Sequence, residues 1–401
     1  MKKIVTIIIC VLFAIPVLTI ALSAKSADPE INEKVDAYFS TEVTETEPHA
    51  KEDGTPYNIC YVDIDPYPPS GEMLYFLLKQ LYDKGWIVLP NNMAFTDLPF
   101  DSSDLDAKEF INYLADLGTG DYISFSKDQN YYIALEDNGY VKKNIEKGIK
   151  NKDIDLILCL GTSPGTLTIG DMGIKDVPIM VYFSVDPVSA GLSYEQEYSG
   201  RDNVWCHTSS DIYKNQLSFY HDTYPFKKIG MVYYSESVGA IAMYRYGAEA
   251  LGDVKIVEKK IDTYDTAEEE EEYYDNLKKV YTDLVEKDGI DAFLLNTDMI
   301  KDPDRMDEYM KIFYDKKIPV FVQNSEFSVA RGATMLMSAS DAVSQAPFAV
   351  DAMIRIFGGE KPGEIYQRFV PSPSISINMG SAEKIDLDIN DEVLRMTERF
   401  Y

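Results

Sequence analysis

Small polar and acidic residues follow several apolar segments of this 401-residue chain. Hydroxyl groups and backbone N–H groups at the start of a helix bind a carboxylate, and an aspartate binds an ammonium group. These residue types therefore predict a site for a small zwitterionic solute. The candidate ligand-binding residues are Ser70, Gly71, Thr162, Ser163, Asp186, Ser235, Glu236, Asn296, Asp298 and Glu326.

Three of these residues have a second interpretation, which the sequence leaves open. Thr162 and Ser163 could cap a helix instead of contacting a ligand. Asp186 precedes Pro187 and could shape a turn, or it could lie at the junction between two lobes.

One short segment has the spacing of a catalytic motif, but the chain offers no partner for it. Residues 161–165, with the sequence GTSPG, match the nucleophile elbow GxSxG with Ser163 at the serine position, but no histidine lies near this candidate nucleophile in the sequence. No GxGxxG, GxxxxGK[ST] or HExxH motif occurs. The 3 histidines lie away from any such motif, and the cysteines lack metal-type spacing. We therefore expect no cofactor, no metal site and no enzyme activity.

The net charge of -29 results from 67 acidic and 38 basic residues. Such a surface repels the phosphates of nucleic acids and the anionic head groups of lipids. Nucleic-acid binding is therefore not expected. We interpret the charge as a means of solubility for a monomeric protein.

The N-terminus has the pattern of a secretory signal peptide. Lys2 and Lys3 precede the apolar residues 4–22, and small residues follow. We assign residues 1–24 to the signal peptide and the polar residues 25–56 to a flexible acidic linker. The protein is then exported and lies in the periplasm or at the cell surface. An uncleaved membrane anchor is the alternative, because the apolar run is long.

Apolar strands and amphipathic helices alternate from residue 57 onward. Residues 57–64 predict a buried strand, and leucines at helical spacing predict a helix that stops at Gly85. Residues 86–89 predict a second strand. Residues 91–139 are less regular, and we interpret them as an insertion with a helix near Phe110 and a hairpin formed by residues 122–125 and 131–135.

Regular alternation returns at residue 155. The predicted strands are residues 155–160, 178–184, 229–233, 254–259, 291–295, 319–322 and 374–378, and the main predicted helices are residues 238–251, 267–287 and 342–357. Repeated β-α-β order predicts an α/β fold with doubly wound parallel sheets. Ligands bind at the carboxyl ends of strands in such sheets, and most of the candidate residues are placed there.

Several segments, taken in order, carry a family resemblance. They are residues 157–163 (ILCLGTS), 177–192 with DPVSAGL at its end, 228–236 (KIGMVYYSE), 329–333 (VARGA), 359–365 (GEKPGEI), and Asn378-Met379 with Ala382. Together they resemble the ABC-transporter substrate-binding proteins of the tryptophan/tyrosine-uptake receptor type. The resemblance spans residues 57–388, with a gap at 91–139, and residues 200–205 match the family only loosely.

The resemblance implies the type I periplasmic binding protein fold, with two lobes joined by a three-strand hinge and a ligand in the cleft between them. It places the first lobe at residues 57–188 with part of 333–375, and the second lobe at residues 189–332 with part of 376–401. Crossovers are expected near residues 186–192, near 323–332 and near the C-terminal strand. The candidates from Ser70 to Asp186 then lie on the first lobe, and the later ones lie on the second lobe or the junction.

The resemblance also implies a function. The chain is expected to be the extracytoplasmic solute-binding protein of an ABC importer, which traps a small polar or amino-acid-like ligand by hinge closure and presents it to a membrane permease. The alternative is a membrane-anchored, ligand-sensing ectodomain of a signalling system.

Overall fold

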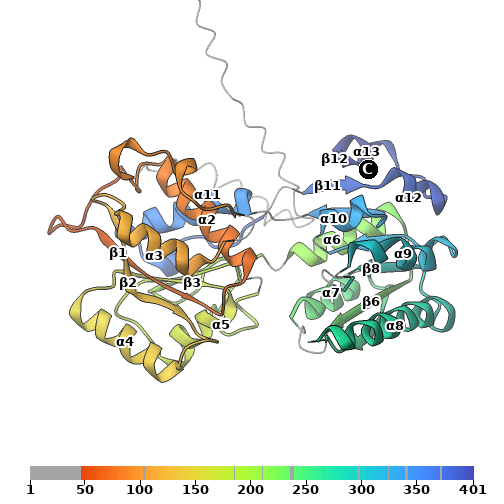
Figure 1. Cartoon of the computed structure of the whole chain (residues 1–401), viewed down its shortest axis with the longest axis horizontal. Coiled ribbons are helices and arrows are strands. Elements are labelled where there is room, and N and C mark those ends of the chain that lie inside the picture. The colour runs from red at the N-terminus through yellow and green to blue at the C-terminus, as the bar shows by residue number, and fades with distance from the viewer. Residues whose placement is uncertain are drawn as a thin grey trace, which may run out of the picture.

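The computed structural model describes residues 47–102, 105–184, 186–209, 211–234, 239–264, 266–295, 299–300, 302–323, 325–338, 342–370 and 373–401. These residues form two lobes that lie side by side, each with helices on both faces of a sheet (Figure 1). The expected signal peptide and residues 25–46 of the expected linker lie outside the described residues. Residues 47–56 pack on the first lobe, where His49 contacts the ring of Trp86 and Lys51 pairs with Asp155 at 2.8 Å.

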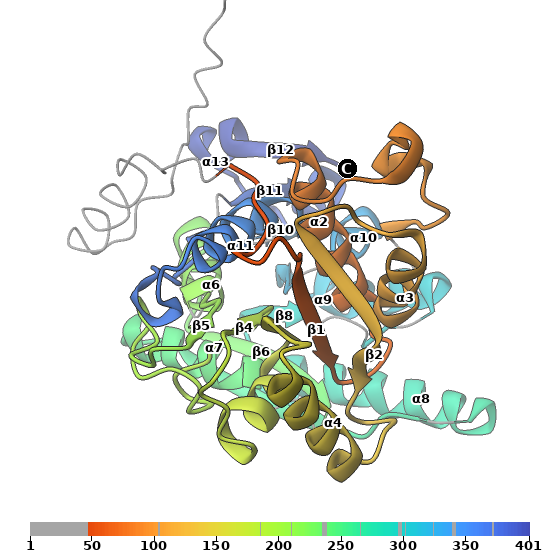
Figure 2. The same ribbon diagram turned by 90° about the vertical axis from the view of Figure 1, so that its left-hand side faces the viewer.

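The first sheet is parallel throughout and has the strand order β2-β1-β3-β4-β5. Figure 2 views this lobe from its outer side, with β1 beside β2. Its strands are β1 (Tyr57–Asp63), β2 (Ile123–Tyr132), β3 (Leu156–Leu160), β4 (Ile179–Tyr182) and β5 (Val204–Cys206).

Alternate side chains of the first sheet fill two separate cores, because successive residues of a strand point to opposite faces. Ile59 and Tyr61 of β1 belong to one core, and Cys60 and Val62 belong to the other. The first core lies under α2 (Pro68–Asp83), α3 (Ala107–Leu117) and α11 (Ala342–Phe357). The second core lies under α4 (Asn138–Asn151), α5 (Thr162–Gly165) and the helical turn at Thr166–Asp171.

One expected strand and one expected hairpin of the first lobe are wrong. Residues 86–89 form no strand; Trp86 and Ile87 are buried as irregular chain. The expected hairpin is one strand, β2, which pairs with β1 and carries a bulge at residues 126–129, since the register passes from Ile59↔Phe125 to Tyr61↔Asn130. The polar bulge residues resemble a turn, although the strand continues beyond them. Residues 91–139 are therefore part of the lobe, through α3 and β2, rather than an insertion.

The second sheet has the strand order β12-β11-β10-β9-β8-β6-β7, and it is parallel except for the β10–β11 pair. Its strands are β6 (Lys228–Tyr234), β7 (Lys255–Ile261), β8 (Ala292–Leu295), β9 (Val320–Val322), β10 (Met335–Ser338), β11 (Ser374–Ile377) and β12 (Thr397–Phe400). The fold class predicted from the sequence, two doubly wound lobes, is confirmed.

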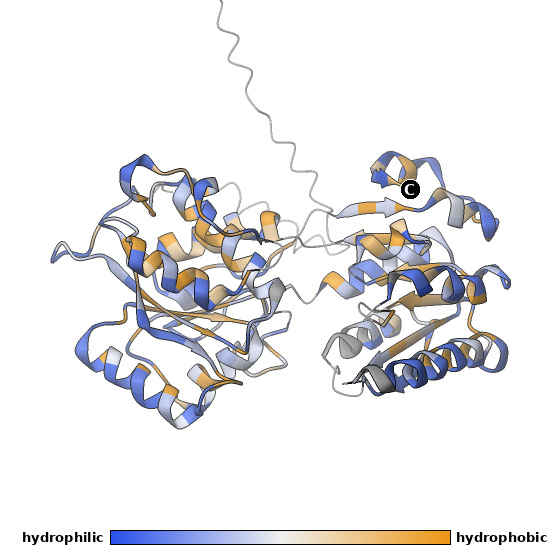
Figure 3. Ribbon diagram, viewed as in Figure 1, coloured by the Kyte–Doolittle hydropathy of each residue, from blue (hydrophilic) through white to orange (hydrophobic). Residues whose placement is uncertain are grey.

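Helices again cover both faces of the second sheet. One face packs against α8 (Ala267–Asp283), α9 (Met306–Tyr314) and α10 (Glu326–Ala330). The other packs against α6 (Asp211–Thr223), α7 (Gly239–Ala250), α12 (Met379–Lys384) and α13 (Asp391–Met396). In Figure 3 the hydrophilic colour covers the outer sides of α4 and α8, while the hydrophobic colour gathers on the strands.

Counted from the described elements, the chain passes between the lobes three times. It does so between β5 and α6, between β10 and α11, and between Val370 and β11. The crossovers expected at residues 186–192 and 323–332 are therefore misplaced, and β5 lies in the first sheet beyond the expected lobe end at residue 188. With three residues, β5 is too short to give a periodic signal.

Candidate ligand-binding site

Two hydroxyl groups meet at the carboxyl ends of β3 and β4. The Oγ1 of Thr162 lies 3.2 Å from the Oγ of Ser184, which is buried. Gly161 makes this approach possible, because its φ of 91° is one that other residues rarely adopt, and its N–H donates to the Tyr182 carbonyl at 2.7 Å. The carboxyl edge of the first sheet therefore presents a pair of hydroxyls beside a helix start, as ligand sites in such sheets do.

A buried carboxylate lies at the carboxyl end of the neighbouring strand β1. Asp63 is 1% exposed and accepts hydrogen bonds from the Tyr61 phenol and the Ile64 N–H, both at 2.7 Å. Burial raises its pKa to about 6, and hydrogen bonds from Tyr61, Ile64 and Ser70 oppose that rise. Ser70, a candidate from the sequence, is thus a partner of Asp63 at the start of α2.

Strained backbone adjoins the hydroxyl pair. Phe183, between Tyr182 and Ser184, has a φ of 61°, which a bulky side chain rarely adopts. Such strain persists only where the surroundings impose it, and it gathers at ligand sites. Because Phe183 directly precedes Ser184, this strained position adjoins the hydroxyl pair and makes the end of β4 a candidate part of the site.

Gly71 serves packing. A Cβ added to Gly71 would lie 2.0 Å from the Leu105 carbonyl oxygen, so α2 can approach this segment only with glycine there. Ser163 is exposed on the first turn of α5 and remains a candidate.

Asp186 shapes the turn that follows β4. Its Oδ1 accepts a hydrogen bond from the Ser189 N–H at 3.1 Å, and the side chain is partly exposed. One carboxylate oxygen of Asp186 therefore shapes the turn, as the sequence allowed. The other carboxylate oxygen remains a candidate ligand contact at the carboxyl edge of the first sheet, where Thr162 also lies.

Glu326 has protein partners in the second lobe. It accepts a hydrogen bond from Ser376 of β11 at 2.8 Å and forms an ion pair with Arg399 of β12. These contacts connect α10 to the C-terminal strands, so its carboxylate is engaged away from any ligand in this arrangement. Four other candidates of the second lobe lie outside the described residues: Ser235, Glu236, Asn296 and Asp298.

Polar side chains also mark the carboxyl edge of the second sheet. Gln216 of α6 donates to the carbonyls of Gln323 and Met337, at 2.7 and 2.8 Å, just after β9 and within β10. At the end of β6, the phenol of Tyr234 lies 3.0 Å from the phenol of Tyr273.

Sequence reasoning missed Asp63, Ser184 and Gln216. Asp63 carried a signal, since it is an acid at the last position of a buried strand. Ser184 ended a predicted strand but was given no role, and Gln216 lay in a helix that the sequence did not reveal.

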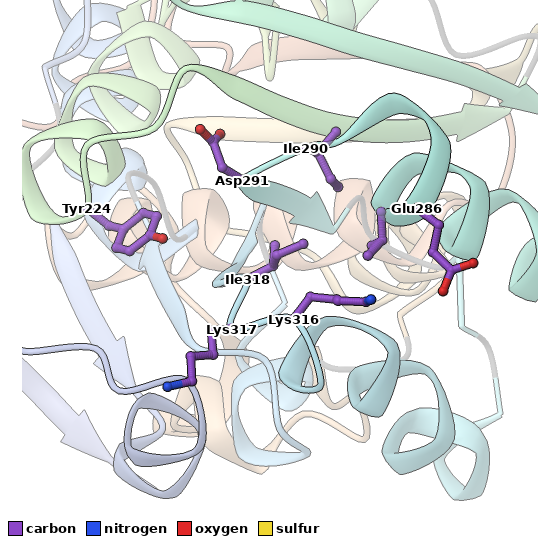
Figure 4. A pocket seen from close by; sticks show the side chains of 8 residues that line it. Tyr224, Glu286, Ile290, Asp291, Lys316, Lys317 and Ile318 are labelled. Atoms are coloured by element: carbon purple, nitrogen blue, oxygen red, sulfur yellow. The ribbon is translucent and has the colours of Figure 1, made fainter.

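A pocket of about 340 Å³ opens at the other end of the second sheet. It is lined by residues that precede β6, β8 and β9, among them Tyr224, Ile290, Asp291, Lys316 and Ile318 (Figure 4). The Asp291 carboxylate accepts from the backbone N–H groups of Lys227 and Lys228. This pocket lies at the amino ends of the strands, so it is separate from the candidate residues.

Within the described ranges, no three His, Cys, Asp or Glu side chains are grouped as a metal site would require. No helix in that part of the chain is long and apolar enough to cross a membrane.

The two sheets, their helices and the three crossovers define a protein of the type I periplasmic binding fold. Residues 98–400 match the ABC transporter substrate binding protein family, and the chain belongs to that family. The match includes residues 98–139, which the resemblance seen in the sequence had left out. Proteins of this family are extracytoplasmic receptors for small molecules and act with a membrane permease.

Solved structures support the same fold. The chain is similar to a conserved domain protein from Vibrio cholerae O1 biovar El Tor, with 17% identity and a TM-score of 0.55 over 86% of this chain and 100% of that one. It is similar to an ABC domain in complex with L-Trp from Streptococcus pneumoniae, with 15% identity and a TM-score of 0.54 over 86% and 100%. It is also similar to the ligand-free, open structure of CD0873, a substrate-binding protein with adhesive properties from Clostridium difficile, with 19% identity and a TM-score of 0.55 over 86% and 98%. No protein of curated function matches the chain.

Proposed function

We propose that this protein is the receptor of an ABC importer and traps a small amino-acid-like solute between its lobes by hinge closure. One observation carries the proposal: the hydroxyls of Thr162 and Ser184 lie 3.2 Å apart at neighbouring strand ends of the first sheet. Strand ends of this kind hold ligands in doubly wound folds.

The residues around this pair suit a zwitterion. Hydroxyl groups donate to a carboxylate, which is an acceptor only. The carboxylate of Asp186, which is partly exposed, would attract an ammonium group on the same edge. The similar Streptococcus pneumoniae protein was solved with L-Trp, which is itself an amino acid.

Hinge closure would complete the site. A ligand that first binds the first lobe gains contacts from the second lobe when the lobes close, and this difference in affinity favours the closed form. A permease that recognises the closed form would then receive loaded receptor. The ligand should leave chemically unchanged, because the family consists of receptors rather than enzymes.

Calorimetry of the purified protein against the amino acids and related small polar solutes tests the proposal. We expect at least one solute to bind with micromolar or tighter affinity, to reduce the radius of gyration in X-ray scattering, and to be recovered intact. If every solute binds more weakly than millimolar, or if the bound solute is converted, the proposal is wrong.

A further inference from the structure

Arg368 is buried at the hinge between two carboxylates. Within the described ranges, Asp63 and Arg368 are the charged residues with less than a tenth of their surface exposed. The guanidinium of Arg368 donates to Glu197 at 2.8 Å and forms a second ion pair with Asp211. A charge this deeply buried is stable only when it is paired.

The two carboxylates belong to different lobes. Glu197 lies in the segment between β4 and β5, and its carbonyl accepts from the Gln367 N–H at 2.9 Å. Asp211 is the first residue of α6, whose Leu217 and Tyr220 lie in a core of the second lobe. Arg368 thus connects the lobes through one side chain.

Two crossovers are fixed to each other and to the first lobe beside this side chain. Thr208 and Arg368 form a parallel bridge, in which Thr208 N–H donates to the Gln367 carbonyl at 2.9 Å and Phe369 N–H donates to Thr208 at 2.8 Å. The Gln367 amide also accepts from the Cys206 N–H at 3.1 Å. These hydrogen bonds therefore fix the first crossover to the first lobe as far as Thr208.

The part of this crossover that could act as a pivot between the lobes is short. Only residues 209 and 210 separate Thr208 from Asp211. A rotation of α6 relative to the first lobe must occur across these residues, and it moves Asp211 relative to Arg368. The ion pair therefore spans the pivot.

We propose that the Arg368–Asp211 ion pair is a latch between the lobes, which stabilises the arrangement described here against closure. This inference rests on the hinge closure in the proposed function, but it needs no particular ligand. Displacing Asp211 leaves a buried guanidinium with one partner fewer, which is unfavourable. The latch therefore sets the fraction of unliganded molecules that close.

Asp211→Asn tests the latch, and Glu197→Gln is the matched control, because it weakens the other ion pair of the same guanidinium within the first lobe. Interlobe distances can be measured by electron–electron double resonance between spin labels at Lys143→Cys on α4 and Asn276→Cys on α8, both exposed positions. Of the 4 native cysteines, Cys60, Cys159 and Cys206 are buried and should stay unlabelled, and Cys10, in the expected signal peptide, is replaced by serine.

Without ligand, we expect Asp211→Asn to raise the short-distance population about fivefold, as the loss of one such ion pair allows. Glu197→Gln should leave the distance distribution unchanged. Asp211→Glu, which keeps the carboxylate, should also show the wild-type distance distribution. Circular dichroism and thermal melting establish that each variant is folded. If Asp211→Asn is not folded, Arg368→Gln, which removes the charge that Asp211 pairs with, replaces it with the same expected shift.

The latch is refuted if the folded Asp211→Asn variant keeps the wild-type distances, or if Glu197→Gln shifts them equally. Failure of every solute to bind would refute the proposed function but leave this result intact. Conversely, tight binding with unchanged distances would refute the latch alone.

Discussion

The phenol of Tyr61 donates a 2.7 Å hydrogen bond to the carboxylate of Asp63, two residues further along β1. Both side chains are buried, and no ion pair to Asp63 occurs in the described part of the chain. The carboxylate is thus held by neutral donors at the edge where a ligand is proposed to bind. Its ionisation should therefore affect stability.

Asp63→Asn should change how stability depends on pH. The pKa of Asp63 is about 6 in the folded protein, against about 3.9 in an unfolded chain. The folded state therefore binds more protons between pH 4 and pH 6, so stability falls as pH rises through this window. Relative to the wild type, Asp63→Asn should gain about 3 kcal/mol between pH 4 and pH 8.

Urea unfolding at several pH values measures this gain. Asp121→Asn, at an exposed position of the same lobe, is the control. Parallel pH profiles for the wild type and Asp63→Asn would show that the carboxylate is not destabilised by burial.

His207 should give a pH dependence of the opposite sign. It lies just after β5, and its ring is buried against Phe348 and Phe369. Burial lowers its pKa to about 4, and the backbone of Ser184 offsets this in part. The unfolded chain takes up a proton near pH 6.5, so stability falls as pH decreases from 6.5 to 4.

His207→Phe should remove an acid-side loss of about 3 kcal/mol between pH 6.5 and pH 4, while it keeps an aromatic ring at the site. Thermal melting across this range measures the loss. His221→Phe, in which the histidine packs on Phe226, is the control. If His207→Phe loses stability in acid as steeply as the wild type, the buried imidazole is not the cause.

The strands with continuous apolar runs were predicted well. Residues 57–64, 155–160 and 229–233 correspond to β1, β3 and β6, because strands buried on both faces need apolar residues at every position. The short strand β5 was missed, and the bulged strand β2 was read as a hairpin. Neither segment shows a regular alternation of apolar and polar residues. The crossover positions were then misplaced, because they follow β5 and β10.

Only part of the candidate site could be proposed from the sequence. Thr162 was proposed because a helix start after a buried strand is visible in sequence. Its partner Ser184 is 22 residues away, and only the pairing of β3 with β4 brings the two together. Gly71 and Glu326 looked like ligand contacts because their packing partners, Leu105 and Arg399, are distant in sequence.

Gly71→Ala should destabilise the protein without any role for a ligand. The added methyl would overlap the Leu105 carbonyl oxygen, and forcing such overlap costs about 3 kcal/mol. Gly170→Ala is the control, because the nearest atom to its Cβ would be 3.9 Å away, and it should gain about 0.5 kcal/mol. Chemical unfolding measures both; equal stabilities of the two variants would contradict the packing role.

Thr162→Val should weaken ligand binding about tenfold with little effect on folding. The substitution keeps the shape of the side chain and removes the hydroxyl that faces Ser184, and a lost hydrogen bond to a charged ligand group is worth about 1.5–3 kcal/mol. Thr96→Val, at an exposed position of the same lobe, is the matched control and should bind as the wild type does. Calorimetry with the tightest solute measures the affinities.

A double variant tests whether the two hydroxyls act together. Because both hydroxyls would serve one ligand group, Thr162→Val combined with Ser184→Ala should lose less binding free energy than the sum of the two single losses. Wild-type affinity in Thr162→Val would remove the hydroxyl pair from the site, and strict additivity would mean that the two side chains act on separate parts of the ligand.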